Sequence, residues 1–473
     1  MGLLAGCQTP NFLDTKEAEV GAPSKADSGE NSTDAQQVGE LPPFTTMVDD
    51  ENAPDQKSQI DTLNEQLAAL PPVEAETIIL KKPLNVEALE GTRIAILLPL
   101  NTPGTTKRGR ELQRLGKALL DSAQMALFDW RNPSINLIPI DTHGTPQGAA
   151  TAAREAVAKG ADIILGPLLS TSVQAVSPIA YQAGIPIVSF SNREEVAGNS
   201  TYIMGFVPQQ QVDALVLHSI ENNITKFAIM APEGPYGEAV VKALQLSTQH
   251  FGGDINRVQF YDPQATDYGE DVKIISDYAR RRHALLSRVE ELEARNDEVS
   301  KAALTQLNQR ETLGEVDFEA ILLPTQNERT LRTIATQLAY YDVDQPNIRI
   351  LGLQLWDSFG NLSSEPPLIG GWYAAPPVEG RQNFFKRHQR IYGNAPDRLA
   401  SLAYDSMALA IILAGKEGTP DYSDTALTNA IGFAGVEGIF RLGKNGIAER
   451  GLAIREIQKE GIKTIKPAPS AFN

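Results

Sequence analysis

The stretch Arg93-Ile94-Ala95-Ile96-Leu97-Leu98-Pro99-Leu100 decides the fold class of this 473-residue chain. A continuous apolar run of this length is typical of a strand buried on both faces of a parallel sheet. Strands and helices then alternate with short loops: helix 112–130, strand 135–141, helix 149–159, strand 162–165, helix 172–182 and strand 185–190. This alternation predicts a doubly wound parallel sheet with helices on both faces.

A second series of the same kind begins near residue 207. Its expected elements are helix 209–220, strand 226–230, helix 237–248, strand 257–261, strand 320–324, helix 327–340 and strand 349–353. Two such series predict two similar α/β lobes. Because ligands of open sheets bind beyond the carboxyl ends of the strands, we expect any ligand site to lie between the lobes.

Residues 271–310 interrupt the second series. Apolar residues recur there every three to four positions among 8 basic and 7 acidic side chains. This pattern predicts a helical insertion with a solvated, salt-bridged face. Its narrow apolar stripe has two interpretations: it packs on its own lobe, or it binds a partner.

The chain before residue 91 has a different composition. Residues 1–90 hold 17 Asp and Glu against 5 Lys, and so carry most of the net charge of −17. The segment 8–90 is too poor in large apolar residues to offset the entropy of ordering, and we predict a disordered acidic tether. The rest of the chain is only mildly acidic and has no cluster of Lys and Arg residues that could bind a phosphate backbone. This argues against nucleic-acid binding.

The single cysteine, Cys7, excludes an intrachain disulfide. The residues Leu4-Ala5-Gly6-Cys7 resemble a bacterial lipobox, which makes Cys7 the expected lipid anchor and residues 1–7 the remnant of a signal peptide. A complete signal needs a longer charged and apolar region, so we expect either a true start further upstream or a fragment. Elsewhere in the chain, no run approaches the roughly 18 apolar residues that span a bilayer.

Four motifs resemble type I periplasmic binding proteins of the leucine-binding protein superfamily. They are DIILGPLLSTS at 162–172, GIPIVS at 184–189, FAIMAPEGPYG at 227–237 and AYDS at 403–406. The resemblance covers about 91–460 and implies a two-lobed domain over 91–473. It places the first lobe at about 91–207 and 378–435, and the second at about 208–377 and 436–473.

Within that superfamily, the lipobox, the acidic tether and the helical insertion are most similar to the penicillin-binding protein activators, the LppC-type lipoproteins. The resemblance implies a non-catalytic lipoprotein, without a cofactor, that activates a peptidoglycan synthase by protein contact. Gln8 follows Cys7 where an Asp would retain a lipoprotein in the inner membrane, which favours the periplasmic side of the outer membrane. The alternative is a periplasmic receptor that delivers an amino acid-like solute to an ABC transporter.

The two alternatives make different demands on the cleft. By resemblance to the amino-acid binders, the cleft residues are Ser170, Ser191, Arg193, Tyr236 and Gln354. In those proteins a carboxylate on the second lobe holds the ammonium group of the ligand, and neutral Gln354 takes that place here. Because a buried charge without a partner is costly, this exchange should weaken amino-acid capture and favour an anion, or no ligand.

Signals for catalysis or metal binding are weak. A hydrolase, the third possibility, needs a nucleophile and base, yet the chain has no GxSxG motif and its only cysteine is the expected anchor. The P-loop-like stretch 438–445 has Asn445 where a Ser or Thr would hold Mg²⁺. The histidines are too far apart in sequence to form a metal-binding motif: His143, His218, His250, His283 and His388. We therefore expect neither an enzyme nor a metal site.

Overall fold

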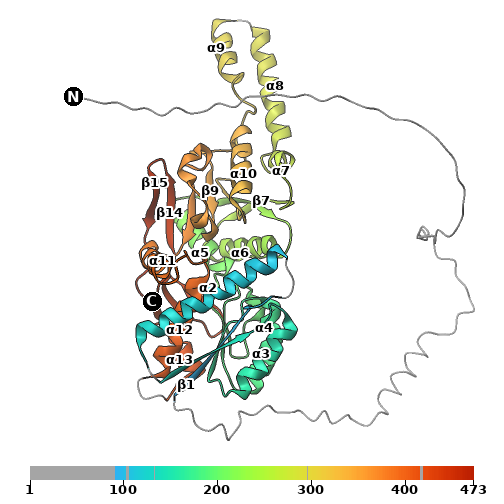
Figure 1. Ribbon diagram of the computed structural model, residues 1–473. Helices are drawn as coiled ribbons and strands as arrows, with labels where there is room; N and C mark the ends of the chain where they lie inside the picture. Colours follow the sequence, from blue (N-terminus) through green and yellow to red (C-terminus); the bar gives the residue numbers. More distant parts are fainter. Residues whose placement is uncertain (1–90, 103–105, 133, 296, 416–418, 473) are drawn as a thin grey trace, which may run out of the picture. The chain divides into compact units, whose positions relative to one another are not determined.

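The computed structural model describes residues 91–102, 106–132, 134–295, 297–415 and 419–472 (Figure 1). The expected signal-peptide remnant 1–7, the anchor Cys7 and the tether 8–90 lie outside these residues. Among the described helices, none is both long and apolar enough to cross a membrane.

The first sheet contains five parallel strands in the order β2-β1-β3-β4-β5. They are β1 (Thr92–Leu98), β2 (Ile135–Asp141), β3 (Ile163–Leu165), β4 (Ile187–Ser189) and β5 (Thr201–Ile203). Helices α3 (Pro146–Ala158) and α4 (Ser170–Gln182) cover one face, and α2 (Lys107–Trp130) and α12 (Ala400–Ala414) cover the other.

Strand β1 explains why its sequence is apolar throughout. Ile94 and Ile96 pack in the core beneath α2 and α12, whereas Ala95 and Leu97 pack in the core beneath α3 and α4. Both faces of the strand are therefore buried, as the continuous apolar run predicted.

The second sheet has seven strands in the order β15-β14-β10-β9-β8-β6-β7. Five of them are parallel: β6 (Lys226–Pro232), β7 (Asp254–Tyr261), β8 (Ala320–Leu322), β9 (Arg349–Gly352) and β10 (Trp372–Ala375). Helices α5 (Pro208–Glu221) and α6 (Pro235–Phe251) cover one face, and α7 (Gly269–Ile275) and α10 (Glu328–Tyr340) cover the other. The predicted fold class, two α/β lobes built on parallel sheets, is confirmed.

The second sheet continues beyond its parallel strands. Strands β14 (Ala453–Gln458) and β15 (Gly461–Lys466) form a hairpin that pairs antiparallel with β10. The expected sheet of this lobe was purely parallel and did not include this hairpin. A two-residue turn at Lys459 and Glu460 permits only antiparallel pairing, because parallel neighbours need a long crossover.

The chain crosses between the two sheets around residues 204–207, 376–377 and 451–452. After the second crossing, α11 (Val378–Tyr392) packs beside α2, followed by α12 and α13 (Asp424–Leu427). A small antiparallel sheet then forms from β11 (Phe433–Gly435), β12 (Gly438–Leu442) and β13 (Ala448–Arg450). Short 3-10 helices lie at Glu194–Val196, Gln354–Ser358, Leu362–Ser364 and Pro366–Leu368.

The small sheet corrects one expected lobe boundary. We placed residues 436–473 in the second lobe, but Phe440, Leu442 and Ala448 pack in the same core as β1. Burial of these apolar side chains beneath α12 holds β12 and β13 with the first lobe until the chain crosses at 451–452. The other lobe boundaries stay predictions.

The predicted insertion is helical, and only part of it leaves the lobe. Val272 and Ile275 of α7 are buried in the core of the second lobe. Helices α8 (Tyr278–Arg295) and α9 (Glu298–Leu307) then form a two-helix hairpin that projects from the lobe (Figure 1). We refer to α8 and α9 together as the hairpin.

Candidate binding cleft

A hollow of about 510 Å³ lies where the loop after β4 faces helix α6. The first lobe contributes Asn192, Arg193, Glu194 and Glu195 to its wall. The second lobe contributes Pro208 and Gln209 from α5, six residues of α6 including Tyr236 and Lys242, and Gln326. We call this hollow the cleft, because its walls come from both lobes.

The first-lobe wall pairs opposite charges. The Arg193 Nε donates to Glu195 Oε2 at 3.0 Å, and the same guanidinium donates to Glu195 Oε1 at 3.4 Å. A backbone hydrogen bond, together with this contact, lowers the pKa of Glu195. Burial, with repulsion from Glu195, raises the pKa of the neighbouring Glu194. The cation that would attract an anionic ligand is thus already held by a carboxylate of its own loop.

The second-lobe wall is one face of helix α6. Tyr236, Ala239, Lys242 and Leu246 recur at helical spacing along the cleft. The helix can start close to the end of β6 because residue 237 is glycine: a Cβ there would lie 1.8 Å from the carbonyl oxygen of Pro232. Burial raises the pKa of Tyr236, so this phenol stays protonated near neutral pH and can donate a hydrogen bond.

Of the five predicted cleft residues, the structure brings Arg193 and Tyr236 together. The other three do not line the cleft. Ser170 is the first residue of α4, and Ser191 is buried, its Oγ accepting a hydrogen bond from the backbone N–H of Arg193 (3.2 Å). Whether any of the five contacts a ligand stays a prediction.

Gln354 is buried and does not line the cleft. Its backbone N–H donates to Gln211 Oε1 at 2.8 Å, which connects the 3-10 helix after β9 to α5. Its own Oε1 has no hydrogen-bond partner within the described part of the chain. A neutral amide therefore occupies the place where the amino-acid binders, by resemblance, present a carboxylate.

The charges of the cleft do not suit a zwitterion. Its carboxylates, Glu194 and Glu195, are on the first lobe, and the second-lobe wall presents Lys242, Tyr236 and Gln326. An amino acid needs an anion for its ammonium group, yet Glu195 is already paired with Arg193, and burial disfavours the charged form of Glu194 by raising its pKa. The arrangement suits a neutral polar group or a carboxylate placed near Lys242 better than it suits an amino acid.

Lys242 and Glu194 were missed by the sequence analysis. Lys242 lies six residues after Tyr236, and Ala239 between them completes a face of the helix. This spacing could have been read from the sequence, and it would have placed Lys242 on the same helix face as Tyr236. No sequence signal marks Glu194, because its position depends on the short 3-10 helix at 194–196.

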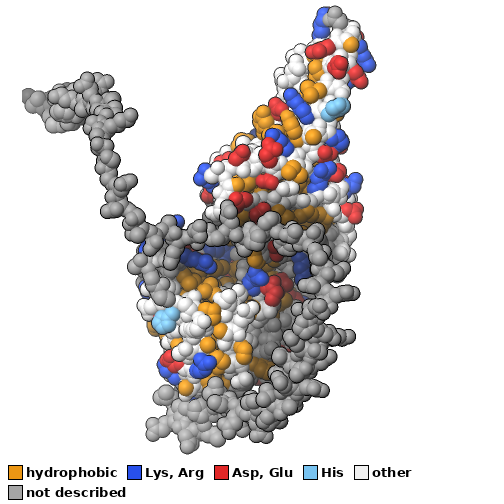
Figure 2. Space-filling model, turned by 90° about the vertical axis from the view of Figure 1, so that its right-hand side faces the viewer, with side chains coloured by type: hydrophobic (Ala, Val, Ile, Leu, Met, Phe, Trp, Pro, Cys, Tyr) orange, Lys and Arg blue, Asp and Glu red, His pale blue; other side chains and the backbone are white. Residues whose placement is uncertain are grey.

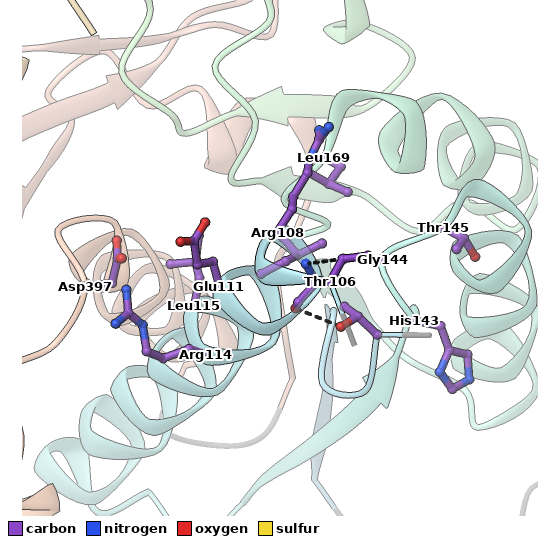
Figure 3. A pocket seen from close by; sticks show the side chains of 13 residues that line it. Thr106, Arg108, Glu111, Arg114, Leu115, His143, Gly144, Thr145, Leu169 and Asp397 are labelled. Carbon is purple, nitrogen blue, oxygen red and sulfur yellow. Dashed lines mark hydrogen bonds between the residues drawn. The ribbon is translucent and has the colours of Figure 1, made fainter. Parts of the chain in front are cut away.

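A second hollow of about 530 Å³ lies entirely on the first lobe, beside the carboxyl ends of β1 and β2. Figure 3 shows Arg114 and Asp397 on one side of it and His143 on the other. The start of α2 forms its floor: Thr106 caps the helix by accepting from the Gly109 N–H at 3.1 Å. None of the predicted cleft residues lines this hollow.

The described residues contain no group of three or more His, Cys, Asp or Glu side chains that could hold a metal ion. The five histidines are separated in the fold as in the sequence. His218 packs against Trp372, with ring centroids 4.7 Å apart, and His388 packs against Tyr392 at the same separation. Burial lowers the pKa of both, which favours the neutral ring.

Comparison with known proteins agrees with the fold. Residues 93–279 match the family model described as "Periplasmic binding protein". A curated but uncharacterized protein of Rickettsia prowazekii is 24% identical over 186 residues, which is 39% of this chain and 47% of that protein. The chain therefore matches about half the length of that relative.

Solved structures extend the similarity across both lobes. A putative branched-chain amino acid ABC transporter protein from Rhodospirillum rubrum aligns with a TM-score of 0.61 at 16% identity, covering 79% of this chain and 100% of that one. An ABC transporter substrate-binding protein from Sphaerobacter thermophilus aligns with a TM-score of 0.57 at 15% identity, covering 81% of this chain and 99% of that one. A solute-binding protein from Rhodopseudomonas palustris was solved in complex with 3,4-dihydroxybenzoic acid. It aligns with a TM-score of 0.54 at 14% identity, covering 81% of this chain and 98% of that one. Residues 93–279 thus match the periplasmic binding protein model, and both lobes share the two-lobed fold of ABC transporter solute-binding proteins.

Proposed function

We propose that this chain is a non-catalytic lipoprotein of the cell envelope that activates a peptidoglycan synthase, a penicillin-binding protein, by direct contact. The observation that carries the proposal is the chemistry of the cleft. Gln354 is neutral, buried and not part of the cleft wall, and Glu195 pairs with the guanidinium of Arg193. A fold that in transport receptors grips a charged solute has here lost the groups for gripping an amino acid.

Activation by contact has a simple thermodynamic requirement. The protein must bind the active state of the synthase more tightly than the inactive state, because a partner with equal affinity for both shifts nothing. Such binding needs an outer surface rather than a deep pocket. Tyr340 is an exposed aromatic residue at the end of α10, packed edge-on against Tyr341 with ring centroids 5.0 Å apart. Exposed aromatic residues of this kind are enriched at the energetic centres of protein interfaces.

The proposed location is the periplasmic side of the outer membrane. Cys7 would carry the lipid, and the acidic segment 8–90 would separate the domain from the membrane. The resemblance of Leu4-Ala5-Gly6-Cys7 to a lipobox supports this assignment, as does the match to the periplasmic binding protein model. Metabolic labelling with a radioactive fatty acid tests it: label should enter the wild type and not Cys7→Ser.

A receptor for a small solute is the second candidate function. The 510 Å³ cleft and the two cations on its walls, Arg193 and Lys242, favour it. A carboxylate such as a benzoate is the ligand class that these cations would suit, whereas Gln354 argues against an amino acid. A receptor of this kind would close its lobes around the ligand.

Thermal melting separates the two candidates. A ligand that binds the folded state raises the melting temperature by mass action. Under the activator proposal, leucine-type amino acids and benzoates leave the melting temperature unchanged, and purified synthase binds the protein. A clear rise with one ligand, lost in Arg193→Gln or Lys242→Gln, together with no binding of synthase, would establish the receptor instead.

A further inference from the structure

The hairpin uses its apolar stripe internally. Leu285 and Leu292 of α8 are buried against α9, where Ser300 is also buried. The stripe is therefore covered partly by α9 and partly by the lobe, because Tyr278 packs against Tyr341 with ring centroids 4.9 Å apart. The opposite face of α8 is uncovered and contains Ala279, His283, Leu286, Glu290 and Ala294, all exposed. We call these five residues the outer face.

Charge is distributed along α8 in two halves. The first half contains Arg280, Arg281, Arg282 and His283 and no acidic residue, and the second contains Glu290, Glu291 and Glu293 together with Arg288 and Arg295. Cations near the start of a helix and anions near its end oppose the helix dipole. The basic first half of α8 is thus unfavourable for this helix alone, although Arg295 in the last turn is favourable. Figure 2 shows both signs of charge along the projecting hairpin, with apolar side chains among them.

The two halves are arranged symmetrically about the point between Leu286 and Ser287. His283 lies as many residues before this point as Glu290 lies after it, and Ala279 corresponds in the same way to Ala294. A helix with this pattern is complementary to an antiparallel copy of itself. Such self-complementarity is what a two-fold, isologous interface requires, because the same patch must serve both subunits.

We propose that the outer face of α8 pairs antiparallel with the outer face of a second copy of this chain. Leu286, with 54% of its surface exposed, then meets Leu286 of the second copy at the two-fold axis. His283 faces Glu290 of the second copy, and the basic first half of each helix lies along the three glutamates of the other. The small side chains of Ala279 and Ala294 let the two helices approach closely at both ends of the contact.

Arg280 and Arg282 already make contacts within their own chain. Arg280 pairs with Asp277, and Arg282 pairs with Glu311 at 3.3 Å. Their side chains nevertheless remain 56% and 36% exposed, so each can share its charge with a carboxylate of the second copy.

The direction of the hairpin makes room for this pairing. Helix α8 begins at its own lobe and runs away from it (Figure 1). Antiparallel pairing therefore places the two lobes at opposite ends of the paired helices. It also brings the tip of each hairpin, where Val299 is 80% exposed, toward the base of the other, where Ile274 is 60% exposed. Two exposed apolar side chains would both become covered.

Pairing of a single helix from each copy buries less surface than a standard protein interface. We therefore expect a weak dimer that exchanges quickly and weakens with salt, because its charges lie at the surface. The inference is independent of the proposed function, since it concerns two copies of this chain and needs no synthase.

Sedimentation of the full-length chain over a concentration series tests the dimer. Leu286→Asp should weaken dimerisation about tenfold or more, by placing two carboxylates together at the two-fold axis. Ile391→Asp is the matched control, because Ile391 is 51% exposed on α11, away from the hairpin, and its substitution should leave dimerisation unchanged. Circular dichroism confirms that both variants are folded.

A charge exchange tests the antiparallel register. His283→Glu alone places two carboxylates opposite each other and should weaken the dimer, whereas the double variant His283→Glu with Glu290→Lys places opposite charges there and should recover it. A wild type that stays monomeric at every concentration overturns the proposal. So does a dimer unaffected by Leu286→Asp, including the case in which that variant instead loses binding to a synthase.

Disulfide trapping gives an independent readout. Leu286→Cys in a Cys7→Ser background should form a covalent dimer under mild oxidation, because the two residues 286 meet at the axis. Ile391→Cys in the same background is the control. Equal trapping of both variants would indicate random collision and contradict the proposed interface.

Discussion

The guanidinium of Arg398 donates two hydrogen bonds to the carboxylate of Glu437, and that carboxylate is completely buried. Ser401 adds a third, from its hydroxyl to Glu437 Oε1 at 2.7 Å. These contacts fasten the start of α12 to the turn between β11 and β12. The turn thereby stays with the first lobe before the chain makes its last crossing to the second.

Breaking this pair should destabilise the domain strongly. Glu437→Gln or Arg398→Met leaves one charge or its hydrogen-bonding groups buried without a partner, which costs about 3–5 kcal/mol. Urea unfolding measures the loss. The exposed pair Arg288 and Glu291 is the control, and Glu291→Gln should cost less than about 1 kcal/mol. Equal losses for both pairs would mean that Glu437 is solvated.

Asp405 should make stability depend on pH near neutrality. Its Oδ1 accepts from the Val436 N–H at 2.8 Å, but burial dominates and raises the pKa of Asp405 from 3.8 to about 7. Arg450 opposes this rise, and Glu437 adds to it. The folded protein therefore keeps a proton that the unfolded chain releases, so the stability from Asp405 is present below pH ~4 and lost as pH rises through about 7.

The variant Asp405→Asn isolates this effect. It should match the wild type in stability at acidic pH and exceed it above pH ~7 by an amount on the order of a few kcal/mol, since each pKa unit corresponds to about 1.4 kcal/mol. Denaturant unfolding of both proteins across this pH range gives the difference. If the two stability curves ran parallel, Asp405 would titrate normally in the fold.

Gly237 should tolerate no side chain. A Cβ at this position would lie 1.8 Å from the Pro232 carbonyl oxygen, so Gly237→Ala must displace the start of α6 and should cost about 1–3 kcal/mol or more. Gly269, at the start of α7, has its nearest neighbour at 3.5 Å. Gly269→Ala should therefore be neutral or stabilise by up to about 1 kcal/mol. Thermal unfolding of the two variants measures this difference in stability.

Arg281 should fix the hairpin to its lobe. Its buried guanidinium donates only to backbone carbonyls, those of Gly314, Tyr341, Asp342 and Ser276 at 2.9 to 3.3 Å. Arg281→Met leaves these groups unpaired and should cost about 3 kcal/mol or more. Hydrogen exchange should rise throughout α8 and α9. Arg288→Met, at an exposed position on the same helix, should change exchange little, and similar exchange in both variants would count against this role.

Parts of the fold were predictable because they rest on patterns local in sequence. The apolar run at 94–98 gave β1, and helical spacing gave α2 and the hairpin. The start of α2 was placed five residues too late, because Thr106 caps a first turn of charged residues that has no apolar periodicity. The packing of Phe440 and Leu442 with the first lobe depends on contacts with α12, which no local pattern contains.

The cleft was predictable only in part for the same reason. Tyr236 was found through a motif at a helix start, and Arg193 through its position after a strand. The positions of Ser191 and Gln354 depend on where the backbone turns beyond each strand. A difference of one or two residues there moves a side chain from the cleft into the protein interior.

The most direct measurement of the central claim is the rate of glycan-strand synthesis by a purified peptidoglycan synthase from the same organism, with and without this protein. The account predicts that the wild type raises the rate, and that Arg193→Gln and Lys242→Gln raise it equally, because the cleft takes no part. An unchanged rate at saturating protein, or stimulation that requires an intact cleft and a bound solute, would contradict it.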